Sequence, residues 1–153
     1  MRFSWRAFLL APLPITFLFS VMTTVSSPPL HPIISFLFFF IAISLFAYVV
    51  TGVLFVPGLL VASKLMRPTA VLAAVLGVVA GIVVYFPMAW LNYTSSGADS
   101  GPPEGTFGQW LWRTRYDWDN WIFPVSGLIT ALLYWWLARR ESRRVEGAAA
   151  HTA

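Results

Sequence analysis

Residues 7–63 read AFLLAPLPITFLFSVMTTVSSPPLHPIISFLFFFIAISLFAYVVTGVLFVPGLLVAS and contain no Asp, Glu, Lys, Arg, Asn or Gln. A helix needs about 20 apolar residues to cross the hydrocarbon of a bilayer, so this stretch is too long for one crossing. The segment Ser26-Ser27-Pro28-Pro29-Leu30-His31-Pro32 divides it, because a helix does not continue through so many prolines. The stretch therefore predicts two membrane-spanning helices joined by a turn.

Two further charge-free apolar runs follow, and the expected spans are residues 7–25, 33–56, 69–91 and 121–138. The second span is expected to end at Pro57-Gly58. Composition agrees, because the chain is 58% hydrophobic and 10% charged, whereas a soluble domain is roughly 25% charged. We predict an all-α membrane protein, a four-helix transmembrane bundle forming a single domain over residues 1–153.

The basic residues predict the orientation of the spans. If four helices alternate in direction, eight basic residues fall on one side of the membrane: Arg2, Arg6, Lys64, Arg67, Arg139, Arg140, Arg143 and Arg144. Only Arg113 and Arg115 fall on the other side. Because cytoplasmic loops retain positive charge, both termini are expected in the cytoplasm, with residues 139–153 as a basic tail. The preference for arginine over lysine suggests a bacterial inner (cytoplasmic) membrane.

The first span has an alternative interpretation. Arg2 and Arg6 before an apolar run are also typical of a signal peptide, and Val25-Ser26-Ser27 loosely resembles a cleavage site. Pro28 directly after it disfavours cleavage, so we expect the span to be retained. Cleavage would leave three spans in the same orientation.

Small residues recur at helical spacing in the last two spans. Ala73, Gly77 and Gly81 form one row, and Gly127 and Ala131 form another. Such rows allow helix backbones to approach closely in lipid. They predict either contact between spans 69–91 and 121–138 within one chain or the interface of a homo-oligomer.

The segment between these spans carries an aromatic pattern. Residues 94–106 are expected to form a linker, and residues 107–120 an extracytoplasmic amphipathic helix. Its apolar stripe would comprise Phe107, Trp110, Leu111, Thr114, Trp118 and Trp121. Arg113 with Asp117, and Arg115 with Asp119, have the spacing of helical ion pairs.

Two roles remain open for this helix. It is expected either to anchor the fourth span at the membrane surface or to bind another membrane component. The second role is favoured by Trp112 and Tyr116, which lie on its polar side. The candidate residues for contact with a partner or with the membrane surface are Trp110, Trp112, Tyr116, Trp118 and Trp121.

The sequence offers no candidate residues for several kinds of catalysis and transport. The chain has no cysteine, its spans carry no acidic or basic side chain, and His31 and His151 are expected on opposite sides of the membrane. Ion-coupled transport and metal catalysis are therefore disfavoured, and we expect no cofactor, no metal and no nucleic-acid partner. The hydroxyl groups in the spans are expected to bond to backbone carbonyls or to neighbouring helices.

Four spans, cytoplasmic termini, and Asp117 and Asp119 before the last span are similar to the architecture of the lipoprotein signal peptidases. Those enzymes use an aspartate pair at the outer face, which would here be Asp117 and Asp119. Residues two apart on one helix project about 200° apart, so these two carboxylates cannot converge on one bond. The family's Asn- and Asp-bearing motifs are also absent from residues 69–91. We therefore expect no enzymatic activity.

The expected function is non-enzymatic. The charge-free spans and the aromatic helix favour a small membrane protein that binds another membrane protein, as an accessory or assembly subunit or as an immunity-type protein. The alternative is an oligomeric channel or transporter for a neutral or lipid-like substrate.

Overall fold

The computed structural model describes residues 4–26, 31–65, 69–95 and 105–150, with residues 118, 119 and 145–150 described by their backbone alone. Every regular element in these ranges is a helix. The elements are α1 (Trp5–Leu10), α2 (Leu13–Ser26), α3 (Pro32–Val50), the π-helical η1 (Thr51–Phe55), α4 (Val56–Leu65), α5 (Ala70–Ser95), α6 (Phe107–Thr114) and α7 (Trp118–Ala150).

Four stretches of the described chain are long and apolar enough to cross a membrane: Trp5–Ser26, Pro32–Leu65, Ala70–Ser95 and Asn120–Arg144. Large apolar side chains remain exposed along them, such as Ile33, Phe38 and Val61. Water would penalise that much exposed apolar surface, whereas lipid does not. The protein is therefore a multi-pass membrane protein, as the sequence predicted.

The first span is broken near its start. Helix α1 ends at Leu10, and α2 begins at Leu13, directly after Pro12. Pro14 then occupies the first turn of α2, where the missing N–H is tolerated because first-turn N–H groups have no partner within the helix. Both Ala7 and Ala11 are fully buried beside the break.

The second span does not end at Pro57-Gly58, and this prediction is wrong. The helix continues to Leu65 because the chain widens into the π-helical segment η1 before Pro57. The N–H of Val56 donates to the carbonyl of Thr51 in a π-type bond. Pro57 follows η1 within this continuous helix, and because it lacks an N–H, a carbonyl one turn earlier loses its usual donor.

The helices that contain the third and fourth spans extend beyond the spans predicted from the sequence. Helix α5 continues past residue 91 to Ser95, and α7 begins at Trp118 and continues through the basic tail to Ala150. Arg, Glu and Ala dominate residues 138–150, and all three favour helix in water as well as in lipid. Helix α7 therefore does not end where the sequence stops being hydrophobic.

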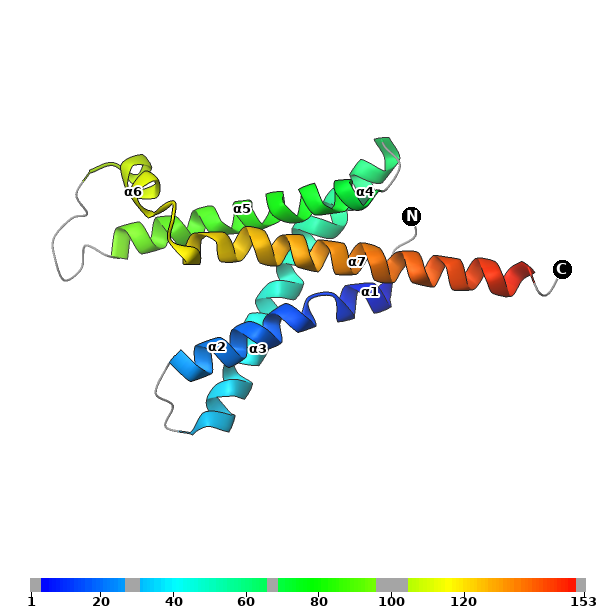
Figure 1. Cartoon of the computed structure of the whole chain (residues 1–153), viewed down its shortest axis with the longest axis horizontal. Helices are drawn as coiled ribbons and strands as arrows, with labels where there is room; N and C mark the ends of the chain where they lie inside the picture. The colour runs from blue at the N-terminus through cyan, green and yellow to red at the C-terminus, as the bar shows by residue number, and fades with distance from the viewer. Residues whose placement is uncertain (1–3, 27–30, 66–68, 96–104, 151–153) are drawn as a thin grey trace.

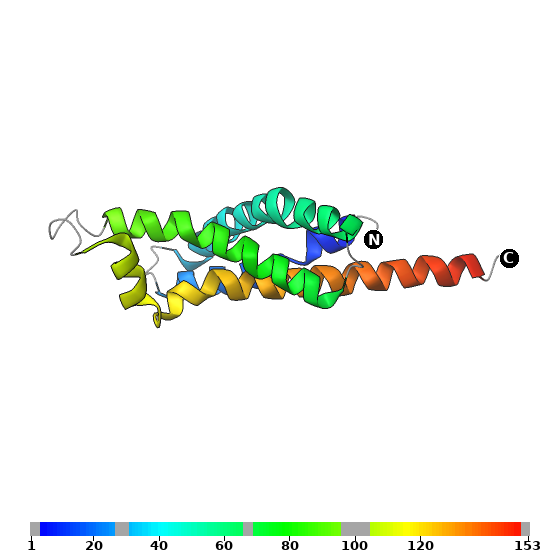
Figure 2. The same ribbon diagram turned by 90° about the horizontal axis from the view of Figure 1, so that it is seen from above.

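The four spans form two pairs rather than one closed bundle. Figure 1 shows α5 and α7 side by side, while the α2–α3 hairpin diverges from them toward one end of the molecule. At that end α6 crosses the ends of α5 and α7, as Figure 2 shows, and we call it the α6 end. Helix α7 extends beyond the opposite end, which we call the tail end.

The buried core lies where the two pairs meet, toward the tail end. It draws on α1, η1, α4, α5 and α7, and comprises Ala7, Ala11, Phe55, Val56, Leu59, Ala73, Ala131, Tyr134 and Ala138. The rings of Phe55 and Tyr134 meet edge to face, 5.5 Å apart. The Ser4 hydroxyl donates to the Glu141 carboxylate, which ties the start of α1 to α7.

Candidate functional site

The small-residue rows of α5 and α7 meet within the chain. A Cβ atom built on Gly77 would overlap Gly127 and Ala131, and one built on Gly81 would overlap the backbone of Phe123 and Pro124. Ala73 continues the same row into the buried core. These surfaces are therefore already occupied by a neighbouring helix of the same chain.

Helix α6 is fixed to the α6 end of α5 by aromatic contacts. The Phe107 ring lies 5.0 Å from that of Trp90 and 5.5 Å from that of Tyr93, while Trp110 lies 6.1 Å from Tyr93. The Tyr93 hydroxyl also donates to the Gly105 carbonyl over 2.9 Å. The first half of the predicted apolar stripe therefore packs on protein.

The start of α6 is capped in a manner that suits its sequence. The Thr106 side chain accepts from the Gln109 N–H, and the Gln109 side chain accepts from the Thr106 N–H, which completes a capping box. Gly105 precedes it with a positive φ of 93°, a conformation that favours glycine.

Helix α6 ends at Thr114 and not at residue 120, so its predicted length is wrong. The Asn120 side chain donates to the Thr114 carbonyl, and the Trp121 indole donates to the Arg115 carbonyl over 3.0 Å. These bonds satisfy the carbonyls at the end of α6. The chain turns at residues 115–117 and enters α7 at Trp118.

The turn changes the partners of the two arginines. Arg113 lies in α6 and Asp117 lies beyond its end, so the two residues do not share one helix as predicted. The guanidinium of Arg115 lies close to two rings, 4.0 Å from the centre of Trp112 and 4.3 Å from that of Tyr116. It also donates to the Trp112 carbonyl over 2.5 Å. The side chain of Asp119, its predicted partner, lies outside the described residues.

Four of the five aromatic candidates have described side chains, and these four separate into two pairs by their contacts. Trp110 is half-buried against Tyr93, and Trp121 uses its indole to cap α6. Trp112 is 68% exposed and Tyr116 is 80% exposed, with Arg115 between them. The Trp118 side chain lies outside the described residues. We call Trp112, Arg115 and Tyr116 the aromatic–arginine surface.

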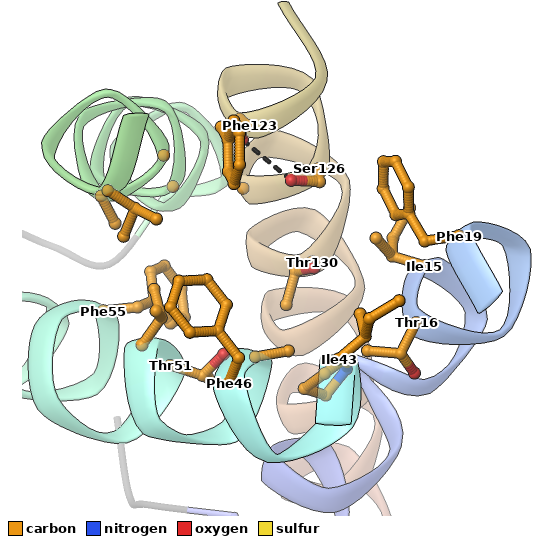
Figure 3. A pocket seen from close by; sticks show the side chains of 18 of the residues that line it. Ile15, Thr16, Phe19, Ile43, Phe46, Thr51, Phe55, Phe123, Ser126 and Thr130 are labelled. Atoms are coloured by element: carbon orange, nitrogen blue, oxygen red, sulfur yellow. Dashed lines mark hydrogen bonds between the residues drawn. The ribbon is translucent and has the colours of Figure 1, made fainter. Parts of the chain in front are cut away.

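A half-open cavity of about 420 Å³ lies between the two helix pairs (Figure 3). The sequence did not predict it. Its walls come from all four spans and are almost entirely apolar. Phe19 lines it from α2, Phe46 from α3, Ala80 from α5 and Ile122 from α7. The cavity arises because the hairpins diverge, which a pattern of hydrophobic residues along the chain does not reveal.

Four hydroxyl side chains line this cavity. Those of Thr16 and Ser126 donate to the carbonyls of Leu13 and Phe123, over 3.0 and 2.9 Å, as the sequence predicted. The hydroxyls of Thr51 and Thr130 make no hydrogen bond within the described part of the chain. For these two residues the predicted bonding is wrong. Buried Ser44 also has no hydrogen-bond partner there, but it does not line the cavity.

The chain matches no protein-family model. No curated protein and no solved structure matches it either. Its function therefore has to be inferred from the residues and contacts of the two sites, the aromatic–arginine surface and the cavity.

Proposed function

We propose that this protein acts by binding another integral membrane protein through its aromatic–arginine surface, as an accessory or assembly subunit or as an immunity-type protein. One observation carries the proposal: Trp112 and Tyr116 are 68% and 80% exposed, and both rings contact the Arg115 guanidinium. Trp, Tyr and Arg are the residues most enriched at binding hot spots.

This surface is not needed to hold α6 in place. Phe107 and Trp110 already attach the helix to Trp90 and Tyr93 of α5. Trp112 lies on the other side of α6, and its ring contacts Arg115. An anchor for α6 alone would not require a second group of aromatic residues, which favours a role in binding.

The arrangement also favours a particular kind of partner. The Arg115 guanidinium lies over the Trp112 and Tyr116 rings, which covers part of it and keeps its charge. Exposed Arg113 adds a second positive charge nearby. A partner presenting a carboxylate next to apolar or aromatic side chains would complement this surface.

We also propose an orientation of the protein in the membrane. We place both termini in the cytoplasm of a bacterium, and the aromatic–arginine surface on the outer side of the inner membrane. The charge bias supports this, since eight of the ten basic residues lie on the terminal side. On that side Arg140 lies 4.1 Å from the Trp136 ring and Arg139 lies 5.1 Å from that of Trp135, pairings suited to a membrane–water boundary.

Co-purification in mild detergent tests the proposal. The variant Trp112→Ala/Tyr116→Ala should lose a membrane-protein partner that the wild-type protein retains, at unchanged levels of membrane insertion. Trp110→Ala is the matched control, because it weakens attachment to α5 but leaves the exposed rings intact. A partner lost with Trp110→Ala and kept with the double variant would contradict the proposal.

Carriage of a neutral or lipid-like substrate is a second candidate function. It is favoured by the apolar cavity, which one chain forms without oligomerisation. Reconstituted protein that moves a neutral lipid between leaflets, and whose transfer stops when the cavity is filled, would support it.

A further inference from the structure

Thr51 combines burial with an unsatisfied hydroxyl. The residue is 5% exposed, lines the cavity, and makes no hydrogen bond from its side chain within the described residues. Figure 3 places it between Phe46 and Phe55, on the wall opposite Thr130 of α7. Among the described residues the fully buried side-chain oxygen without a partner is that of Ser44, so the Thr51 oxygen is accessible from the cavity. A hydroxyl in such apolar surroundings usually has a hydrogen-bond partner. The missing partner is therefore expected inside the cavity.

Thr51 also lies at a change in the backbone. Thr16, Ser20 and Thr24 donate to carbonyls of regular helix three or four residues earlier. Thr51 begins the π-helical segment η1. Pro57 lacks an N–H, so a carbonyl one turn before it also loses its usual donor. Single π-helical turns inside α-helices occur frequently at functional sites.

The walls define the chemistry of the occupant. Within the described residues, no acidic or basic side chain lines the cavity, so a charged group would be unfavourable there. The volume of about 420 Å³ lies in the range of roughly 300–1,000 Å³ that small-molecule sites occupy. The occupant is therefore uncharged, mainly apolar, and carries an oxygen that can bond to Thr51.

The depth of the site restricts the occupant further. Thr16, Thr51 and Thr130 all lie well inside their spans rather than at the ends. A phospholipid keeps its head group and ester oxygens near the membrane surface, whereas a lipid without a charged head can carry an oxygen to this depth. We infer that the cavity binds one neutral lipid with carbonyl oxygens and no charged head, of the quinone type, with a carbonyl accepting from Thr51. The inference does not depend on the proposed partner.

Photolabelling in lipid nanodiscs tests the inference, with an azido-benzoquinone carrying a decyl chain as the probe. Label should map to cavity residues such as Phe46 and Ile122. Thr51→Val should weaken binding roughly two- to tenfold, the range expected for one lost hydrogen bond. Thr24→Val is the matched control, because its hydroxyl bonds to the Ser20 carbonyl outside the cavity, and it should bind as the wild type does.

A filling variant provides the second test. Ala42→Phe places a ring in the cavity and should reduce labelling at least tenfold, while Ile41→Phe, on a lipid-exposed position next to it, should not. Decylbenzene, which lacks the carbonyls, should compete more weakly than the unlabelled quinone. Label spread over lipid-facing Leu45 and Val53, unchanged in both cavity variants, would overturn the inference. So would equal binding by Thr51→Val, or a retained phospholipid that excludes the quinone.

Discussion

Gly77 of α5 and Gly127 of α7 face each other with no side chain between them. A Cβ built on Gly77 would lie 2.5 Å from the Ala131 Cβ and closer still to the Gly127 carbonyl oxygen. Lipid provides no hydrophobic force that draws helices together, so such pairs depend on close van der Waals contact. This contact makes α5 and α7 the most closely packed pair of the structure.

Gly77→Ala should destabilise the protein by about 1–3 kcal/mol, because the added methyl group forces the two helices apart. Gly58→Ala is the matched control, since its Cβ would meet only the Leu76 side chain at an ordinary 3.7 Å. Unfolding in mixed micelles with increasing SDS measures both variants. Equal stability of the two would mean that α5 and α7 do not pack as described.

Ser4→Ala should cost about 0.5–2 kcal/mol of stability. Its hydroxyl caps α1 by accepting from the Ala7 N–H over 3.0 Å and also donates to Glu141 of α7. Ser142→Ala, which removes only a bond to the carbonyl four residues earlier, should have a much smaller effect. Thermal unfolding in detergent compares the stability of the two variants. If Ser142→Ala loses as much stability as Ser4→Ala, the proposed contribution of the contact between Ser4 and Glu141 is refuted.

Phe107→Ala should release α6 from α5, because it removes ring contacts to Trp90 and Tyr93 of α5 worth about 0.5–1.5 kcal/mol each. Hydrogen exchange of α6 amides should then accelerate. In Trp112→Ala it should stay slow, since that ring lies outside the cluster. Fast exchange already present in the wild-type protein would show that α6 is not fixed.

The orientation can be tested without background labelling, because the chain has no cysteine. In intact cells a membrane-impermeant maleimide should label Gly108→Cys, which lies exposed on α6, but not Ser142→Cys on the tail of α7. After the membrane is permeabilised, both should react. Labelling of Ser142→Cys alone in intact cells would invert the proposed topology.

The sequence predicted the spans well because their number depends on local hydrophobicity, but their ends were less predictable. Pro57 is normally a reliable end signal, yet the helix passes through η1 and Pro57 and continues to Leu65. Thr114 ends α6 because Asn120 folds back onto its carbonyl, which a helical-wheel projection of residues 107–120 cannot anticipate. Both helix ends were predicted wrongly because each depends on local hydrogen bonds or helix geometry that the sequence pattern does not reveal.

The two candidate sites also differed in how far the sequence could predict them. Trp112 was identifiable because its position opposite the apolar stripe follows from helical periodicity. Tyr116 was also singled out by that periodicity, but it lies in the turn after α6, so its exposure has a different cause. The cavity was not identifiable, because it exists only where separate hairpins diverge, and Thr51 is indistinguishable in sequence from the hydroxyl residues that bond to their own helix. A proline within an apolar run, six residues after a threonine, is at most a weak signal for such a site.

The most direct test of the proposed function is a photo-crosslinking amino acid placed at position 112 in the native membrane. We expect it to crosslink a single membrane protein other than this chain, and Arg115→Ala in the same protein to reduce that crosslink markedly. The same crosslinker at position 121 should not reproduce it. Crosslinking to lipid alone, or to a second copy of this chain, would contradict the claim that the aromatic–arginine surface binds a partner protein.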